Sequence, residues 1–238
     1  MEKLLLVDGG NTTLKVCLTP LDTFKPTDVE IIPYSSLHRL EKYKEINLKV
    51  VSTVKPSTLG EIKKFLKNPY VVKLKDTLPL IGVDYRTPHT LGIDRVVSAI
   101  GGLYYDRSFI KVSFGTATVV DVVINKTFQG GAIFPGLEKS ILCLVAHTDL
   151  LPKVEIEKKP PLVGKDTKSC IQSGVFYSQV FTVKGFIEKL QKELKIKTVL
   201  LTGGAAGLFK ECFPSAVFDP YLTFRGLYEI AKTLKGRK

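Results

Sequence analysis

The chain lacks the cysteine and histidine patterns that are typical of zinc-binding and disulfide-bonded proteins. Its few cysteines are scattered, at Cys17, Cys143, Cys170 and Cys212. No two of them form a C-x-x-C pair, so the usual structural zinc motifs are excluded. In a reducing compartment such isolated cysteines are usually small buried apolar residues. The three histidines are isolated as well, so no Ser-His-Asp or Cys-His catalytic set is predicted.

Long apolar runs are missing, and so is the pattern of a secretory leader. No stretch is long enough to cross a bilayer, and the first residues, Met1-Glu2-Lys3, lead into only a short apolar run. We therefore expect a cytoplasmic protein with no membrane partner. Tryptophan is absent and methionine occurs once, whereas Lys and Glu are abundant, which favours a thermophilic source.

Acidic residues are outnumbered by basic ones. The chain has 35 Lys and Arg residues against 23 Asp and Glu residues, which gives a net charge of +12 at pH 7. Such a surplus attracts anions, including polyphosphates and nucleic acids. However, no basic stripe is interleaved with aromatic residues, and no nucleic-acid motif is present. We therefore predict no nucleic-acid partner.

A length of 238 residues, of which 44% are hydrophobic, suits one large domain or two small ones. Apolar patterns and turn residues predict strands at 3–7, 12–18, 29–33, 48–53, 70–74, 109–113, 117–124, 128–133 and 198–201. They predict helices at 35–43, 56–66, 94–105, 136–148, 165–191 and 221–234. The order of strands and helices starts again after residue 107, which predicts two duplicated domains, 1–107 and 108–238.

The first hairpin turn is rich in hydrogen-bond donors. The turn and the strand after it read Asp8-Gly9-Gly10-Asn11-Thr12-Thr13-Leu14-Lys15. Glycines let backbone N–H groups come close to an anion, hydroxyls and an ammonium add further donors, and a carboxylate such as Asp8 suits Mg²⁺. The alternative is an ordinary Asx turn. The density of donors favours a phosphate site.

Two later glycine turns give weaker signals. Gly115-Thr116-Ala117-Thr118 joins two predicted strands; its hydroxyls fit phosphate oxygens, and a hairpin without a ligand fits equally well. Thr202-Gly203-Gly204 follows a strand and opens a helix, which fits either close approach to a flat ligand such as adenine or a plain turn.

The segment Gly92-Ile93-Asp94-Arg95 places a carboxylate beside a guanidinium at the predicted start of a helix. Asp94 could accept the proton of a substrate hydroxyl during phosphoryl transfer. The planar fork of Arg95 suits a substrate carboxylate. The alternative is that Asp94 caps the helix and Arg95 is a surface ion.

In this order the motifs resemble those of the type III pantothenate kinases, in the actin/hexokinase/Hsp70 superfamily. The matching segments are D-x-G-N-T-x-x-K at Asp8–Lys15, G-x-D-R at Gly92–Arg95, G-T-A-T at Gly115–Thr118, G-G-A-I-x-P-G at Gly130–Gly136 and T-G-G at Thr202–Gly204. The resemblance implies an α/β fold of two duplicated actin-like ATPase (ribonuclease H-like) domains with a cleft between them. It also implies ATP-dependent phosphorylation of pantothenate to 4′-phosphopantothenate, the first step of coenzyme A biosynthesis.

The resemblance assigns roles to individual residues. ATP would be bound by Asp8 through Lys15 and by Thr116, with Asp8 near Mg²⁺. Asp94 would be the general base on the pantothenate hydroxyl. The residues implied to contact pantothenate are Tyr85, Gly92, Ile93, Asp94, Arg95 and Thr167. The family is dimeric, and Thr167 would reach the substrate across the interface of a homodimer.

One position departs from the family pattern. The family usually has Asp two residues before the glycine of G-T-A-T, where it binds an activating K⁺ or NH₄⁺; here the residue is Ser113. A hydroxyl is a poorer cation ligand than a carboxylate, so a monovalent-cation requirement is in doubt. We hypothesise that Lys111, on the same strand face as Ser113, supplies a tethered ammonium instead.

Two other classes of function fit the same fold. The first is a non-catalytic regulator that binds a nucleotide or coenzyme A, and the second is a kinase of another small alcohol, such as a sugar, or a polyphosphate hydrolase. Asp8 and Asp94 argue against a regulator, because a protein that only binds needs neither a metal carboxylate nor a base. The short chain argues against typical sugar kinases, which have insertions.

Overall fold

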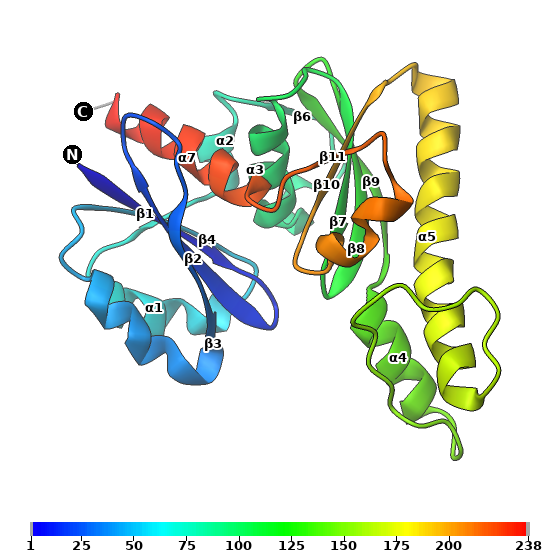
Figure 1. The fold of residues 1–238 in the computed structure, drawn as a ribbon. Coiled ribbons are helices and arrows are strands. Elements are labelled where there is room, and N and C mark those ends of the chain that lie inside the picture. Colours follow the sequence, from blue (N-terminus) through cyan, green and yellow to red (C-terminus); the bar gives the residue numbers. More distant parts are fainter. Residues whose placement is uncertain (1, 237–238) are drawn as a thin grey trace. The chain divides into compact units, whose positions relative to one another are not determined.

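The computed structural model describes residues 2–236 and separates into two compact units (Figure 1). The N-terminal unit comprises Met1–Tyr105, Lys126–Phe128 and Tyr221–Lys238. The central unit comprises Asp106–Asn125 and Gln129–Pro220. Among the described residues, no helix has both the length and the apolar character needed to span a bilayer.

The N-terminal unit is built on a five-stranded sheet with the order β3-β2-β1-β4-β5. The strands are β1 (Lys3–Gly9), β2 (Thr13–Pro20), β3 (Thr27–Pro33), β4 (Leu48–Thr53) and β5 (Tyr70–Val71). Strand β1 runs antiparallel to β2 and parallel to β4. Its run from Leu4 to Val7 is fully buried, as is typical of a strand covered on both faces. This central strand ends at the predicted phosphate turn.

Helices cover the sheet of the N-terminal unit. They are η1 (Tyr34–Tyr43), η2 (Pro56–Thr58), α1 (Leu59–Leu66), α2 (Leu74–Thr77), η3 (Pro88–Thr90), α3 (Ile93–Gly102) and α7 (Leu222–Lys235). Leu37 and Leu40 of η1 and Ile62 and Leu66 of α1 pack in one core cluster with the apolar side chains of β1, β2 and β4. The short strand β6 (Gly82–Val83) pairs with Thr127 and Phe128 of the same unit.

Helices α3 and α7 of the N-terminal unit pack with their backbones in direct contact. A Cβ atom on Gly101 would lie 2.0 Å from the carbonyl oxygen of Leu222. One on Gly226 would lie 1.8 Å from the carbonyl oxygen of Val97. Only glycine allows this approach at either position. The packing fixes α3, and with it the Gly92–Arg95 segment at its start.

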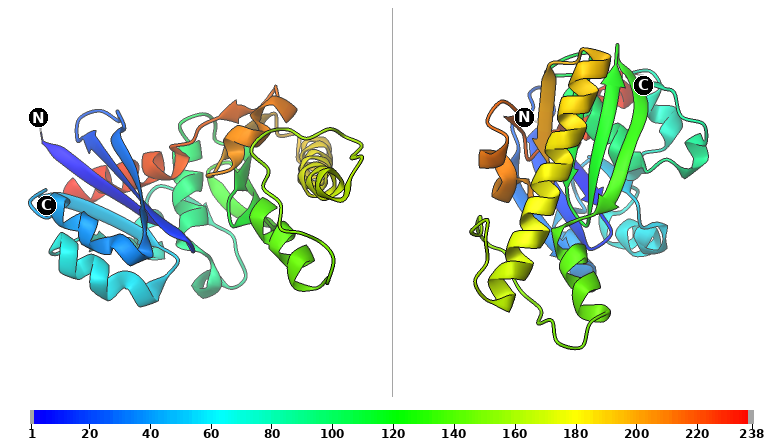
Figure 2. Two further views of the ribbon diagram at one scale, coloured as in Figure 1. Left: turned by 60° about the horizontal axis from the view of Figure 1, so that its bottom comes forward. Right: turned by 90° about the vertical axis from the view of Figure 1, so that its right-hand side faces the viewer.

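The central unit is built on strands in the order β11-β10-β7-β8-β9. They are β7 (Phe109–Phe114), β8 (Ala117–Ile124), β9 (Thr127–Pro135), β10 (Thr198–Thr202) and β11 (Val217–Phe218); the first residues of β9 belong to the N-terminal unit. The helices are α4 (Leu137–Ala146), α5 (Thr167–Leu194), α6 (Ala206–Phe209) and η4 (Lys210–Cys212). The long helix α5 lies along the sheet (Figure 2).

Alternate residues of β7 form the core of the central unit. Ile110, Val112 and Phe114 point to one face and pack with Phe176 of α5 and Phe209 of α6. The rings of Phe114 and Phe209 stack at a centroid distance of 4.3 Å. Such stacked rings add to the free energy gained by burying their area. The opposite face of β7 therefore presents Lys111 and Ser113.

Most predicted elements are present, and the differences occur in short ones. The strand expected at 70–74 ends at Val71, and Leu74–Thr77 is one helical turn with Asp76 accepting a hydrogen bond from the backbone N–H of Lys73. The predicted helix at 35–43 is a 3₁₀ helix. The predicted domains, 1–107 and 108–238, stay a proposal; helix α7 belongs to the N-terminal unit.

Candidate functional site

The first predicted phosphate turn lies at the end of β1. Asp8 is opposite Lys15 of β2 and beside Ser52 of β4, whose hydroxyl donates to Asp8 Oδ1 at 3.4 Å. Directly opposed residues of an antiparallel pair point to the same face. The carboxylate of Asp8 and the ammonium of Lys15 therefore share one face of the sheet, as a site for phosphate with its metal requires.

Backbone contacts hold the turn in place. The N–H of Gly10 donates to the carbonyl of Thr13 at 3.1 Å, and the hydroxyl of Tyr34 donates to the carbonyl of Gly10 at 2.5 Å. A Cβ atom on Gly9 would lie 2.5 Å from Thr53 Oγ1, so the position requires glycine. Burial raises the pKa of Tyr34, and the nearby carboxylate of Asp8 adds to this rise, so the hydroxyl stays a donor.

The predicted ATP-binding residues differ in exposure. Asn11 and Thr12 are exposed at the tip of the turn, and Thr13 and Lys15 are half-buried. The side chain of Leu14 is fully buried in the core, so Leu14 could contact a nucleotide only through its backbone. Lys55, whose ammonium lies 4.3 Å from the centre of the Tyr34 ring, adds a cation near this turn that sequence reasoning missed.

The second predicted turn joins β7 to β8. The N–H of Gly115 donates to the carbonyl of Ala117 at 3.1 Å, and the N–H of Gly136 donates to the carbonyl of Thr116 at 3.1 Å. A Cβ atom on Gly136 would lie 2.1 Å from the carbonyl oxygen of Gly115. Gly136, the last residue of the G-G-A-I-x-P-G motif, thus packs directly against the turn.

The third glycine motif meets the same turn. Gly203 has a φ of +98°, in the region that favours glycine, and a Cβ atom there would lie 2.4 Å from the carbonyl oxygen of Phe114. The N–H of Ala205 donates to that carbonyl at 3.0 Å. Three motifs that are far apart in sequence therefore converge at the end of β7 in the central unit.

Ser113 and Lys111 lie on the same strand, and Lys111 forms a buried ion pair. Its ammonium is 2.9 Å from Oδ2 of Asp121, with the two side chains 1% and 0% exposed. Lys111 and Asp121 are directly opposed in the β7–β8 ladder. The sequence pattern indicates the lysine but not Asp121, which only the strand register places opposite it.

Helix α3 begins at the segment that holds the predicted base. Gly92 is the residue before the first helical turn, and Asp94 is the second residue of the helix, so Asp94 does not cap it. A Cβ atom on Gly92 would lie 2.6 Å from Asp94 Oδ1, so the carboxylate is folded back over Gly92. The N–H of Arg95 donates to the carbonyl of Gly92 at 3.1 Å.

Two predicted substrate residues are neighbours in the structure. The guanidinium carbon of Arg95 lies 5.9 Å from the ring centre of Tyr85 and 5.3 Å from that of Phe128. The two rings are 6.3 Å apart, and the N–H of Asp84 donates to the carbonyl of Phe128 at 2.9 Å. Arg95 is buried, so these rings hold its planar fork in one orientation. Phe128 was not predicted.

Thr167 belongs to the central unit, at the first residue of α5. Asp166 caps the helix by accepting from the backbone N–H of Ser169 at 2.9 Å, and this hydrogen bond lowers the pKa of Asp166. Thr167 is exposed and lines an apolar cavity of about 600 Å³ between α4 and α5, together with Cys143 and Cys170.

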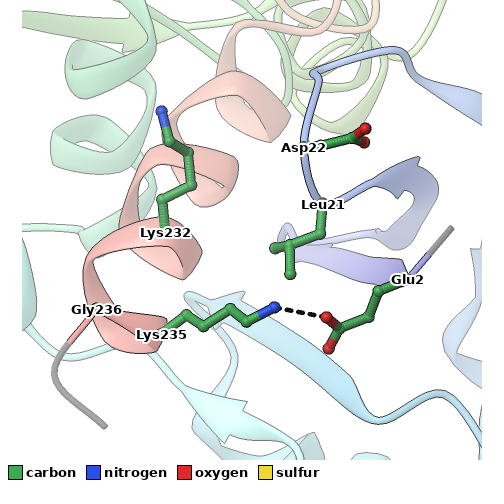
Figure 3. A pocket seen from close by; sticks show the side chains of 6 residues that line it. All are labelled: Glu2, Leu21, Asp22, Lys232, Lys235 and Gly236. Atoms are coloured by element: carbon green, nitrogen blue, oxygen red, sulfur yellow. Dashed lines mark hydrogen bonds and ion pairs between the residues drawn. The ribbon is translucent and has the colours of Figure 1, made fainter.

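A second cavity, of about 570 Å³, lies beside α7 in the N-terminal unit. Lys235 forms an ion pair with Glu2 at its edge, and Leu21 and Asp22 approach from the loop after β2 (Figure 3). None of the predicted site residues lines this cavity.

The described residues contain no cluster of three or more His, Cys, Asp or Glu side chains that could hold a metal ion. Mg²⁺ in phosphoryl-transfer sites is usually held by one or two carboxylates together with substrate phosphates and water. A single carboxylate at Asp8, on a face shared with Lys15, fits that pattern.

Comparisons with known proteins agree on one family. The family model for type III pantothenate kinase matches residues 4–189. A type III pantothenate kinase of Sulfurihydrogenibium sp. (strain YO3AOP1) is 35% identical in an alignment 251 residues long, and the alignment covers 96% of this chain and 99% of that protein.

Solved structures show the same fold. A Campylobacter jejuni protein described as a Baf family transcriptional activator has a TM-score of 0.69 at 21% identity, with 98% of this chain and 100% of that chain covered. The polyphosphate/ATP-glucomannokinase of Arthrobacter sp. strain KM has a TM-score of 0.53 at 11% identity, with both chains fully covered at 100%. These likenesses confirm the predicted fold class. By the family match and the full-length relative, the chain belongs to the type III pantothenate kinase family.

Proposed function

We propose that the chain transfers the terminal phosphoryl group of ATP to the hydroxyl of pantothenate, which gives ADP and 4′-phosphopantothenate for coenzyme A biosynthesis. Membership of the type III pantothenate kinase family supports this reaction. The structural observation behind it is the start of α3, where Asp94 and Arg95 are adjacent and Arg95 lies against the ring of Tyr85.

The family implies ATP-dependent phosphoryl transfer and a divalent metal. We assign ATP phosphate binding to Asp8 through Lys15 and to Thr116, and Mg²⁺ binding to Asp8. When bound, Mg²⁺ would neutralise charge on the phosphates. The protein supplies backbone N–H groups at the two glycine turns and the ammonium of Lys15, all of which favour the negative charge of the phosphates.

We assign pantothenate binding to the start of α3 and its neighbours. Asp94 accepts the proton of the substrate hydroxyl as the oxygen attacks phosphorus. Arg95 binds the substrate carboxylate, because a guanidinium fork held by two rings keeps the geometry for a bidentate contact. Tyr85 lines the pocket, and Gly92 and Ile93 contact the substrate through their backbone.

The position at which the family binds a monovalent cation differs in this chain. Ser113 offers only a hydroxyl at the family's cation position, whereas Lys111 places a fixed ammonium on the same strand face, paired with Asp121. We propose that this ammonium replaces K⁺ or NH₄⁺ as the positive charge in that part of the sheet.

Three further features belong to the proposal and rest on the family resemblance. The chain would work as a homodimer in which Thr167 contacts the substrate of the other subunit. It would be cytoplasmic, and its two duplicated domains would follow the division at residue 107.

A direct assay tests the reaction. The purified chain, with Mg²⁺ and ATP, is offered pantothenate and, separately, a panel of sugars and small alcohols, and ADP release is measured. We expect ADP release with pantothenate and with none of the other acceptors. Turnover with a sugar but not with pantothenate would point to a different kinase. Tight binding of a non-hydrolysable ATP analogue, without turnover on any acceptor, would point to a regulator.

A further inference from the structure

A glutamine in the middle of α5 is buried at the base of the second glycine turn. Gln179 is only 3% exposed, and its neighbour Thr118 only 1%. The hydroxyl of Thr118 donates to Gln179 Oε1 at 2.6 Å. Gln179 Nε2 donates to the carbonyl of Pro135 at 2.9 Å. Both polar ends of one buried side chain are therefore hydrogen-bonded within the central unit.

The partners fix the orientation of the amide. A carbonyl oxygen can only accept, so the nitrogen of Gln179 must face Pro135. The oxygen then faces Thr118, whose hydroxyl can donate to it. A side chain that could only accept would leave the carbonyl of Pro135 without this hydrogen bond, and one with no polar atom would also leave the buried hydroxyl of Thr118 without its acceptor, which is costly.

The two partners flank the turn that we assign to ATP. Thr118 follows Thr116 by two residues and is paired with Phe114 in the β7–β8 ladder. Pro135 directly precedes Gly136, whose N–H donates to the carbonyl of Thr116 at 3.1 Å. Gln179 thus holds the strand that leaves the turn and also the segment that packs against it.

We propose that Gln179 is a positioning residue for nucleotide binding, an inference that rests on the assignment of Thr116 to ATP under the proposed function. Gln179 does not touch the phosphates. It fixes Thr118 and Pro135, so that the backbone of Gly115 and Thr116 is already in its binding geometry before ATP arrives. Preorganised donors bind an anion more tightly than donors that must first be ordered.

Helix α5 holds the side chain of Gln179 in a fixed position. The helix is continuous from Thr167 to Leu194, and Val175, Phe176, Val180 and Val183 on either side of Gln179 are buried in apolar clusters. An amide on a packed helix loses little entropy when it forms its hydrogen bonds. The same side chain on a loop would hold the turn less well.

The test replaces Gln179 by Met, which has a similar length and no amide. We expect Gln179→Met to weaken binding of a non-hydrolysable ATP analogue with Mg²⁺ about tenfold, because the variant lacks both hydrogen bonds that hold Thr118 and Pro135. The KM for ATP should rise in parallel, whereas the KM for pantothenate should change less than about twofold. Calorimetry of the analogue and steady-state kinetics of the full chain give the two readouts.

Gln191→Met is the matched control. Gln191 is on the same helix, and its Nε2 donates to the carbonyl of Lys197 at 3.1 Å, so the same chemical change removes a hydrogen bond far from the turn. The control should bind the analogue as the wild type does. Equal weakening in both variants, or no weakening in a folded Gln179→Met, would overturn the proposal.

A second variant covers the case in which Gln179→Met does not fold. Gln179→Glu keeps the acceptor for Thr118 but loses the donor to Pro135 while the carboxyl is ionised. Burial raises the pKa of a carboxyl, so the group takes up a proton, and regains a donor, as the pH is lowered over the range in which the variant stays folded. The affinity of Gln179→Glu for the analogue, relative to that of the wild type, should rise as the pH is lowered over that range. If this affinity ratio does not change with pH, the proposal is contradicted.

The binding experiment tests the role of Gln179 independently of the proposed reaction. Analogue binding needs no phosphate acceptor. If the wild type binds the analogue but leaves pantothenate unchanged, the proposed function fails, and the effect of Gln179→Met on binding still decides the role of Gln179.

Discussion

Asp94 and Gly92 are matched to each other at the residue scale. Asp94 Oδ1 lies 2.6 Å from the place that a Cβ atom on Gly92 would take, so any larger residue at position 92 would displace this carboxylate. This carboxylate is the one that we propose as the base.

We predict that Asp94→Asn lowers kcat with pantothenate by about a hundredfold or more, because the amide cannot accept the proton of the hydroxyl. The affinity for a non-hydrolysable ATP analogue should stay within about twofold of wild type. Kinetics and calorimetry on the same preparation check both values. If substantial turnover remains, Asp94 is not the base.

The buried pair of Lys111 and Asp121 gives a second prediction at this scale. Wild-type activity should be the same in K⁺, NH₄⁺ and Na⁺ salts, because the ammonium is built into the chain. Lys111→Met should lose activity in Na⁺ and regain part of it with K⁺ or NH₄⁺, which can take the place of the removed ammonium beside Asp121. The variant removes the ammonium that balances the charge of a buried carboxylate, so a loss of about 3 to 5 kcal/mol of stability is expected.

Activity measured against salt type at constant ionic strength is the readout for this pair. The double variant Lys111→Met with Asp121→Leu serves as control, because it removes both charges and should show neither the instability nor the rescue. A wild type whose activity rises steeply with added K⁺ would remove the reason for the proposal.

Residues with local motifs were predictable from the sequence, and their long-range partners were not. The glycines and threonines of the two turns stand in short patterns, and so do Asp94 and Arg95. Phe128, Asp121 and Gln179 matter because of strand register or helix packing with residues far away in the chain. No spacing along the sequence gives such a register when only one sequence is known.

At the scale of elements, the contact between α3 and α7 decides where the start of α3 lies. Gly101→Ala would place a methyl group 2.0 Å from a carbonyl oxygen of α7, so the helices must separate. We predict a loss of about 3 kcal/mol in unfolding free energy and a lower kcat, since α3 holds Asp94. Denaturant unfolding and kinetics measure the two effects.

Gly185→Ala is the control for the helix contact. Gly185 lies inside α5, is exposed, and has no atom within 4 Å of an added Cβ. Alanine there should stabilise the protein by about 0.5 to 1 kcal/mol, because it restricts the unfolded chain and favours the helix. If both glycine variants change stability by the same amount, the close packing of α3 and α7 is not the cause.

Long elements with an apolar pattern were predicted well, and the two-residue strands β6 and β11 were not predicted. Helix α5 and strands β1, β7 and β8 have apolar patterns over many residues, which is what sequence reasoning detects best. Strands β6 and β11 have two residues each, too few for any period. They form because a neighbouring strand offers free backbone groups, and that neighbour is known only once the chain has folded.

At the scale of the whole molecule, the proposed homodimer predicts that two inactive variants can complement each other, which a monomer could not do. If Thr167 acts on the substrate of the other subunit, Asp94→Asn and a Thr167→Ala variant of low activity complement each other. One of the two sites in a mixed dimer then combines the intact Asp94 of one chain with the intact Thr167 of the other. When equal amounts of the two variants exchange subunits, half of the dimers are mixed and one of the two sites in each mixed dimer is intact. About a quarter of wild-type activity should therefore return.

Assays before and after subunit exchange measure the complementation, and each variant mixed with itself is the control. Activity that stays at the sum of the two variants would show that Thr167 acts within its own chain or has no role. Light scattering on the same samples reports whether a dimer is present at all.

Composition also makes a prediction for the whole chain. Abundant Lys and Glu, with a single methionine and no tryptophan, favour a protein that resists heat. We expect a melting temperature above about 80 °C, well beyond the usual range of mesophilic domains. Calorimetry checks this value, and unfolding near 55 °C would contradict it.

The return of α7 to the N-terminal unit has a consequence for biosynthesis. Helix α7 follows the whole central unit in the sequence, yet it packs against α3 of the N-terminal unit. While the chain is still on the ribosome, α3 lacks the helix it packs against and exposes apolar surface around Val97 and Ile100. Helix α3 therefore reaches its final packing only after α7 has been made, and a stop codon that removes α7 would disturb the segment that holds Asp94.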